Sequence, residues 1–244
     1  MPDPAAVSGA ADRGPSGSAP ALDAVLFDLD GTFADTAPDM GAALNRLLAR
    51  HGRAPLPLPA IRPHVSSGSR GMLQIGFGVA PGDDGYEGLR SDYLAIYAGD
   101  ICCDTRPFDG IPELIGALEN RGLAWGIVTN KPGWLTDPML AAMGLPGTPA
   151  CIVSGDTAAR PKPHPDPLLH ACRLIDRLPS ACCYIGDDRR DIIAGRAAGM
   201  ATIAALYGYL GIESHPRDWG ADALIDHPLA LLRWLDAVPA TAAA

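Results

Sequence analysis

The segment from Ala24 to Thr32 places the strongest constraint on the fold of this chain. Its first residues are apolar and predict a buried strand of a parallel sheet. Asp28 and Asp30 follow this strand, and Gly31 comes directly after them. In an extended chain the two carboxylates point to the same side, about 7 Å apart at Cα, where they repel each other unless a cation or a proton intervenes. Because open α/β sheets bind ligands at the carboxyl ends of their strands, we expect a reactive site here.

Two later apolar runs also end in polar side chains, and a loop between them holds a lysine flanked by prolines. The segments are Leu123–Lys131, which contains Thr129 and Asn130; Arg160–Pro163, which contains Lys162; and Ala181–Asp191, which contains Asp187 and Asp188 and ends in Asp191. Prolines on both sides restrict the loop, which would help to aim the lysine. Carboxylate oxygens suit Mg²⁺, so the acidic segments predict a Mg²⁺ site.

Strand-like and helix-like segments alternate beyond residue 107. Expected strands lie near residues 123–129, 151–154, 181–186, 201–206 and 223–225, and expected helices near Ile111–Asn120, Leu135–Met143, Pro165–Arg177 and Asp191–Ala198. Such alternation predicts a parallel sheet with right-handed crossovers. The predicted fold class is α/β, with a doubly wound, Rossmann-like parallel sheet as its core.

Between the first strand and this region, the pattern is helical and interrupted by proline and glycine, without a convincing strand. Thr36 and Asp39 predict a capping box at the start of a helix that runs through Met40 and Leu48. We therefore expect a small α-helical cap domain inserted into the core. The expected division is a disordered tail over 1–21, a core over 22–37 and 105–237, a cap over 38–104 and a frayed end over 238–244.

Composition limits the classes of partner that we expect the chain to have. The net charge of −9 argues against a nucleic-acid backbone as the main partner, and no apolar run reaches the length of a membrane span. The N-terminal region has neither the basic start nor the apolar middle of a signal peptide. The six cysteines include no Cys-x-x-Cys motif, which argues against a zinc site or a disulfide framework and favours a reducing cytosol. We expect a cytoplasmic protein without membrane or nucleic-acid partners, and the sequence leaves open whether it is a monomer or a homodimer.

The order of an acidic pair, a hydroxyl, a lysine and a second acidic cluster resembles the haloacid dehalogenase (HAD) superfamily of phosphohydrolases. The helical insertion after the first strand matches the subgroup that contains phosphoglycolate phosphatase and β-phosphoglucomutase. Segments such as Trp125–Pro132, Gly186–Ile192 and Tyr207–Tyr209 look like the phosphoglycolate phosphatase type, and most like its branch that acts on N-acetylmuramic acid 6-phosphate in cell-wall recycling. The resemblance covers about residues 22–236.

This resemblance implies a role for each motif residue. It makes Asp28 the nucleophile that forms an aspartyl-phosphate, and Asp30 the acid and then the base. The other implied roles are phosphate binding by Thr129, Asn130 and Lys162; Mg²⁺ binding by Asp28, the backbone carbonyl of Asp30, and Asp187; and support by Asp191, through water or by orienting Lys162. For Asp188, a supporting role and a simple helix N-cap stay open. The implied substrate is a small phosphorylated metabolite.

Arg70 is a candidate for binding the substrate from the cap, because it lies in the glycine-rich segment Ser66–Gly71, which we expect to be a loop. The alternative is an exposed arginine without a ligand. Three other functions also stay open: a phosphomutase, a haloacid dehalogenase and a non-catalytic module that binds sugar phosphates. Asp30 and the cluster around Asp187 favour phosphate chemistry over dehalogenation.

Overall fold

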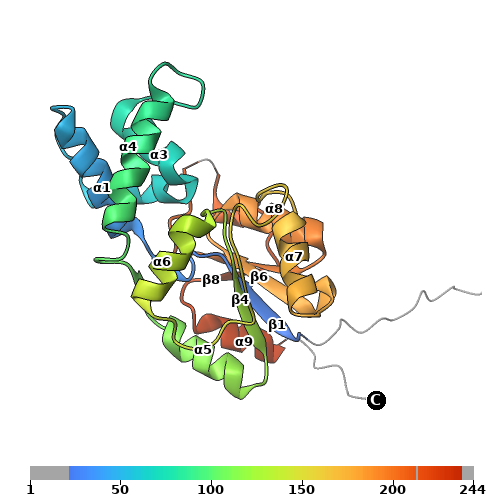
Figure 1. Ribbon diagram of the computed structural model, residues 1–244. Helices are drawn as coiled ribbons and strands as arrows, with labels where there is room; N and C mark the ends of the chain where they lie inside the picture. The colour runs from blue at the N-terminus through green and yellow to red at the C-terminus, as the bar shows by residue number, and fades with distance from the viewer. Residues whose placement is uncertain (1–21, 213, 238–244) are drawn as a thin grey trace, which may run out of the picture.

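The computed structural model describes residues 22–212 and 214–237 and contains a six-stranded parallel sheet with helices on both faces (Figure 1). The strand order is β5-β4-β1-β6-β7-β8. The strands are β1 (Ala24–Phe27), β4 (Ala124–Val128), β5 (Cys151–Val153), β6 (Cys182–Gly186), β7 (Ala201–Ala205) and β8 (Ala223–Ile225). The chain goes from β1 outward to β4 and β5, returns past β1 to β6, and then continues outward to β7 and β8, so the sheet is doubly wound. This confirms the predicted fold class.

The central strand β1 is buried on both faces because its side chains alternate between two hydrophobic clusters. Val25 and Phe27 pack in one cluster with side chains of α5, α6 and α9, whereas Ala24 and Leu26 pack in another with those of α7 and α8. These helices are α5 (Ile111–Asn120), α6 (Gly133–Met143), α7 (Asp166–Leu174), α8 (Arg189–Ala198) and α9 (Ala230–Ala237). A strand buried on both sides explains why its sequence is a continuous apolar run rather than an alternating one.

The helical block, α1 to α4, projects from one side of the sheet (Figure 1). Its helices are α1 (Ala37–Arg50), α2 (Leu58–Ile61), α3 (Gly68–Phe77) and α4 (Tyr86–Gly99), with the 3₁₀ helix η1 (Arg62–Ser67) before α3. Leu44, Leu47 and Met72 belong to a third hydrophobic cluster that joins α1, α3 and α4. A short antiparallel ribbon of β2 (Ala34–Asp35) and β3 (Arg106–Pro107) lies where the chain enters and leaves the block. Two further 3₁₀ helices, η2 (Pro179–Ala181) and η3 (Pro216–Asp218), belong to the rest of the chain.

Two local predictions were wrong. Thr36 and Asp39 form no capping box, because the side chain of Thr36 makes no cap hydrogen bond. The carboxylate of Asp39 instead accepts hydrogen bonds from the main-chain N–H groups of Asp104 and Thr105. Ser66–Gly71 is not a loop, because it contains the end of η1 and the first turn of α3.

The predicted tail over 1–21 and the frayed end over 238–244 lie outside the described residues. The division into core and cap at residues 38 and 104 stays a prediction. Within the described part of the chain, no helix combines the length and apolar character needed to cross a bilayer.

Candidate active site

Three neighbouring strands bring their polar residues to one edge of the sheet. Phe27, the last residue of β1, is in register with Ile127 of β4 and Ile185 of β6. Asp28 and Thr129 therefore emerge beside each other, with Asp187 just beyond the end of β6. This edge lies at the point where the crossovers change direction, which is where open α/β sheets bind ligands.

A cavity of about 310 Å³ lies between this edge and the helical block. Its floor includes all but one of the predicted core residues, and its far wall comes from the block. The predicted residues that line it are Asp28, Asp30, Arg70, Thr129, Asn130, Lys162, Asp188 and Asp191. Asp187 lies behind this surface and is fully buried.

Lys162 places a buried ammonium group directly on Asp28. Its Nζ is 2.8 Å from Asp28 Oδ1 and 2.7 Å from Asp191 Oδ1, and it also bonds to the Tyr184 hydroxyl at 2.7 Å. Burial lowers the pKa of Lys162, but the carboxylates of Asp191 and Asp28 outweigh burial, so its pKa rises. Lys162 is thus a buried cation in direct contact with both carboxylates, and an orienting role for Asp191 stays a prediction.

Asn130 holds the loop that carries this lysine. Its side-chain amide donates to the carbonyl of Lys162 and accepts from the N–H of Lys162, each at 2.9 Å. Its side chain is therefore engaged with the protein main chain, and a phosphate contact would come from its own main-chain N–H. The hydroxyl of Thr129, by contrast, lies at the cavity and accepts the N–H of Lys131 at 3.0 Å.

The carboxylates at this edge are crowded and buried. One oxygen each from Asp28, Asp187 and Asp191 lies within 4.8 Å of the others. Burial raises the pKa of Asp28 to about 7 against the opposing effect of Lys162, and burial and the charge of Asp28 raise that of Asp187. A hard divalent cation would stabilise the ionised forms, so this donor set fits Mg²⁺.

Close backbone approach explains two glycines beside this cluster. A Cβ at Gly31 would lie 2.2 Å from Asp187 Oδ2, and one at Gly208 would lie 2.2 Å from Asp187 Cβ. Gly31 also has a positive φ of 92°. The turn after β1 and the loop after β7 can therefore pass this close to Asp187 only with glycine at these positions.

Asp30 is held by two partners, of which the sequence interpretation named neither. Its Oδ1 accepts from Lys131 Nζ at 2.7 Å and from Thr36 Oγ1 at 2.6 Å, while its Oδ2 has no hydrogen-bond partner in the described residues. Lys131 is buried and lies 4.9 Å from the centre of the Tyr97 ring. The sequence signal that could have indicated Lys131 as a site residue is its position directly after Thr129 and Asn130.

Asp188 is the N-cap of α8, and it also belongs to the cavity wall. It forms a capping box with Asp191 and pairs with Arg190 at 2.8 Å. Arg190 in turn donates to the carbonyl of Ser66 in the helical block at 2.6 Å, and the Ser66 hydroxyl donates to Asp187 Oδ2 at 3.1 Å. The sequence signals did not indicate these contacts between block and sheet.

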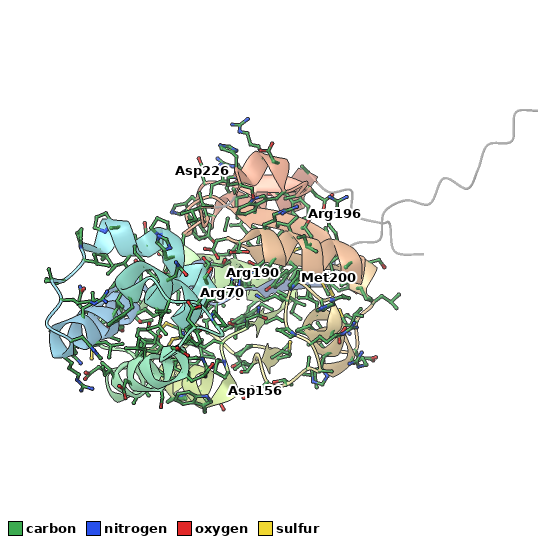
Figure 2. All side chains as sticks on the ribbon, turned by 90° about the horizontal axis from the view of Figure 1, so that it is seen from above. Arg70, Asp156, Arg190, Arg196, Met200 and Asp226 are labelled. Carbon is green, nitrogen blue, oxygen red and sulfur yellow. The ribbon has the colours of Figure 1, made fainter. Side chains whose placement is uncertain are left out.

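The wall contributed by the helical block carries Arg70 of α3 and Arg90 of α4. Both are exposed, and the only ion pair of either within the described residues joins Arg90 to Glu87 at 3.9 Å. Burial raises the pKa of the neighbouring Tyr86, and both guanidinium charges oppose this rise. Figure 2 shows Arg70 near Arg190, at the junction of the block and the sheet.

Comparisons with known proteins identify the family of this chain. A family model described as haloacid dehalogenase-like hydrolase matches residues 25–205. The N-acetylmuramic acid 6-phosphate phosphatase of Pseudomonas aeruginosa is 44% identical over 215 residues, which cover 88% of this chain and 95% of the relative. A phosphoglycolate phosphatase of Xylella fastidiosa is 45% identical over 211 residues, which cover 86% of this chain and 91% of the relative.

The fold has solved counterparts as well. The crystal structure of a predicted phosphoglycolate phosphatase from Haemophilus somnus aligns with a TM-score of 0.77 at 23% identity, covering 87% of this chain and 97% of that one. At this identity the likeness concerns the fold alone. The family match and the curated relatives go further: the chain is a phosphatase and belongs to the haloacid dehalogenase-like hydrolase family.

Proposed function

We propose that this phosphatase hydrolyses, with Mg²⁺, a phosphate monoester that also carries a carboxylate, through an aspartyl-phosphate on Asp28. The observation that carries this proposal is the buried ammonium of Lys162, fixed 2.8 Å from Asp28 at the floor of the cavity. An ammonium there neutralises the nucleophile and an incoming phosphate together, which reduces their mutual repulsion.

In the first half of the reaction, an Asp28 carboxylate oxygen attacks phosphorus as the ester P–O bond breaks. Asp30 donates a proton to the departing alkoxide, and its Oδ2 is the oxygen available for this because Oδ1 is bound by Lys131 and Thr36. Thr129 and the main-chain N–H of Asn130 bind the transferring phosphoryl oxygens.

In the second half, water attacks the phosphorus of the aspartyl-phosphate. Asp30 takes a proton from that water, the Asp28–phosphorus bond breaks, and inorganic phosphate leaves with Asp28 again a free carboxylate. One residue thus acts first as the acid and then as the base, as the two opposite proton transfers require.

Mg²⁺ would be held by Asp28 and Asp187, with Asp191 at the edge of the cluster and the backbone carbonyl of Asp30 as a further ligand. The bound ion supplies positive charge to the transferring phosphoryl group. The raised pKa values of Asp28 and Asp187 support this assignment, because without a cation the buried nucleophile is only partly ionised near neutral pH.

Substrate choice rests on the helical block, which we propose acts as a cap over residues 38–104. Both relatives named above act, by their names, on phosphate esters that also contain a carboxylate. Arg70 and Arg90 are the exposed cations that face the cavity opposite Asp28. We assign them to the substrate carboxylate, with N-acetylmuramic acid 6-phosphate preferred over 2-phosphoglycolate because the tyrosine-rich cavity exceeds the size of the smaller ester. The first substrate would give the enzyme a role in cell-wall recycling.

A phosphate-release screen with matched substrates tests the proposal. N-acetylmuramic acid 6-phosphate and N-acetylglucosamine 6-phosphate differ by the lactyl carboxylate, and 2-phosphoglycolate and 2-hydroxyethyl phosphate differ by carboxylate against hydroxymethyl. We expect the carboxylate member of each pair to have the higher kcat/KM. Activity should disappear with a chelator, return with Mg²⁺ and be inhibited by Ca²⁺, which prefers longer bonds and more ligands. Full activity in excess chelator would refute the metal dependence, and equal rates within both pairs would refute the carboxylate assignment.

A further inference from the structure

Tyr209 does not line the cavity, yet it contacts both the acidic cluster and the helical block. It lies in the loop after β7, and its main-chain N–H donates to Asp187 Oδ2 at 2.8 Å. Its side chain is 5% exposed and belongs to the hydrophobic cluster of the block. One residue therefore touches a proposed Mg²⁺ ligand with its backbone and the inserted helices with its side chain.

The Tyr209 hydroxyl caps the first helix of the block. It accepts from the main-chain N–H groups of Thr36 at 2.8 Å and Ala37 at 2.9 Å, and it donates to Asp35 Oδ1 at 2.9 Å. The first N–H groups of an α-helix have no partner within the helix and normally use an N-cap side chain. Here the cap comes from a residue 172 positions away in the chain, which leaves the side chain of Thr36 free.

That freed side chain is the one that holds Asp30. Thr36 Oγ1 donates to Asp30 Oδ1 at 2.6 Å, so the residue whose main chain Tyr209 holds also fixes the orientation of Asp30. Arg62 reinforces the arrangement from the block, because it pairs with Asp35 and lies over the Tyr209 ring, 5.6 Å from its centre.

We propose that Tyr209 is a positioning residue for Asp30 and that it acts through Thr36. Its hydroxyl holds the point where the chain enters the helical block, and this point sets the direction of the Asp30 carboxylate. An effect of Tyr209 on the reaction, the kinetic part of this inference, rests on the proposed acid and base role of Asp30. The capping of α1 by the Tyr209 hydroxyl, the structural part, does not.

The structural part is tested by hydrogen–deuterium exchange on Tyr209→Phe, which keeps the ring and removes the hydroxyl. The amide of Thr36 loses its acceptor, whereas that of Ala37 keeps a long contact of 3.4 Å to Asp35 Oδ1, so exchange should accelerate about tenfold or more at Thr36 and less at Ala37. Tyr207→Phe is the matched control, because the Tyr207 hydroxyl lies on the same loop and donates to the carbonyl of Thr32 instead. Unchanged exchange in Tyr209→Phe, or equal acceleration in both variants, would overturn the proposal.

The kinetic part is tested with an alkyl and an aryl phosphate. A misplaced acid slows the ester with the poor leaving group more, so kcat on the alkyl phosphate should fall about tenfold further than kcat on the aryl phosphate in Tyr209→Phe. Accelerated exchange with an unchanged alkyl-to-aryl ratio would overturn the link to Asp30 while leaving the proposed phosphatase chemistry intact. If Tyr209→Phe does not fold, Thr36→Val decides the link to Asp30 by the alkyl-to-aryl ratio, because it removes the hydroxyl that donates to Asp30 and keeps the main-chain N–H that Tyr209 accepts; an unchanged ratio would overturn the link.

Discussion

The two walls of the cavity carry their positive charges in different ways. On the sheet side, Lys162 and Lys131 are buried and each pairs with an aspartate at 2.7 to 2.8 Å. On the side of the helical block, Arg70 and Arg90 are exposed and line the cavity, and among the described residues their only ion pair is the long contact of 3.9 Å between Arg90 and Glu87. Buried, paired charges have one geometry, whereas exposed side chains adapt to a ligand. The sheet therefore suits chemistry common to every phosphate ester, and the block suits the part of the substrate that varies.

Among the tests of this contrast, Asp28→Asn has the largest expected effect. An amide cannot form the acyl phosphate, so we expect steady-state phosphate release to fall on the order of 10⁴-fold or more on every substrate. Asp109→Asn, on an exposed carboxylate outside the cavity, is the control for the charge change. Thermal unfolding should show that both variants are folded, and multi-turnover activity near wild type in Asp28→Asn would exclude Asp28 as the nucleophile.

Asp30→Asn tests the sheet side in a second way. It removes the proton donor and the later base, so kcat on an alkyl phosphate should fall on the order of 10²- to 10⁴-fold. An aryl phosphate has a better leaving group and should lose less. Steady-state rates on both esters check this expectation, and equal losses would contradict the acid role.

For the arginines of the helical block, we expect substitutions to lower kcat/KM by an amount that depends on the substrate. Arg70→Ala, Arg70→Gln and Arg90→Gln should each lower kcat/KM on the carboxylate-bearing esters by about 10- to 100-fold, because contacts remote from phosphorus orient the substrate. The same variants should keep most of their activity on an aryl phosphate. Arg50→Gln, on an exposed arginine of α1 outside the cavity, is the matched control. If kcat/KM fell equally on all substrates, or on none of them, the proposed difference between the two walls would be wrong.

The smallest expected effect is on stability in the absence of metal. The pKa of Asp28 rises from 3.8 to about 7 in the folded protein, so the folded state binds an extra proton between these values. The free energy of unfolding should therefore fall as pH rises through this range, by about 1 kcal/mol per pH unit from this group. Denaturant titrations in chelator at pH 5, 6 and 7 measure the slope. Asp28→Asn should flatten it, and an unchanged slope would show that another group is responsible.

Much of the site could be predicted because its residues follow strand ends. Asp28, Thr129 and Asp187 each follow an apolar run, and parallel strands bring such positions to one edge of a sheet. The run of strands and helices also predicts which element carries each residue, since periodicity and length are local properties. These parts of the fold and of the site depend on short stretches of sequence.

The hydrogen-bond partners of the polar side chains, by contrast, could not be predicted from short stretches of sequence. Thr36 and Asp39 have the spacing of a capping box, yet Thr36 binds Asp30, and Asp39 binds the returning chain at Asp104 and Thr105. The helix cap comes instead from Tyr209, far along the chain. The hydrogen bonds of a local motif can be replaced by bonds to any donor or acceptor that folding brings near. The local sequence does not show which distant groups these will be.

The sequence by itself thus determined the sheet, the inserted helices and the identity of the chemical groups, because strand burial and motif order are encoded within short segments. Only the tertiary structure decided that Lys131 holds Asp30, that Ser66 reaches Asp187, and that Arg90 joins Arg70 at the cavity. These contacts join segments that are distant in sequence, and their geometry depends on how the helical block lies against the sheet. The physical reason is that a hydrogen bond or an ion pair depends on the position of both partners, whereas an apolar run depends mainly on its own burial.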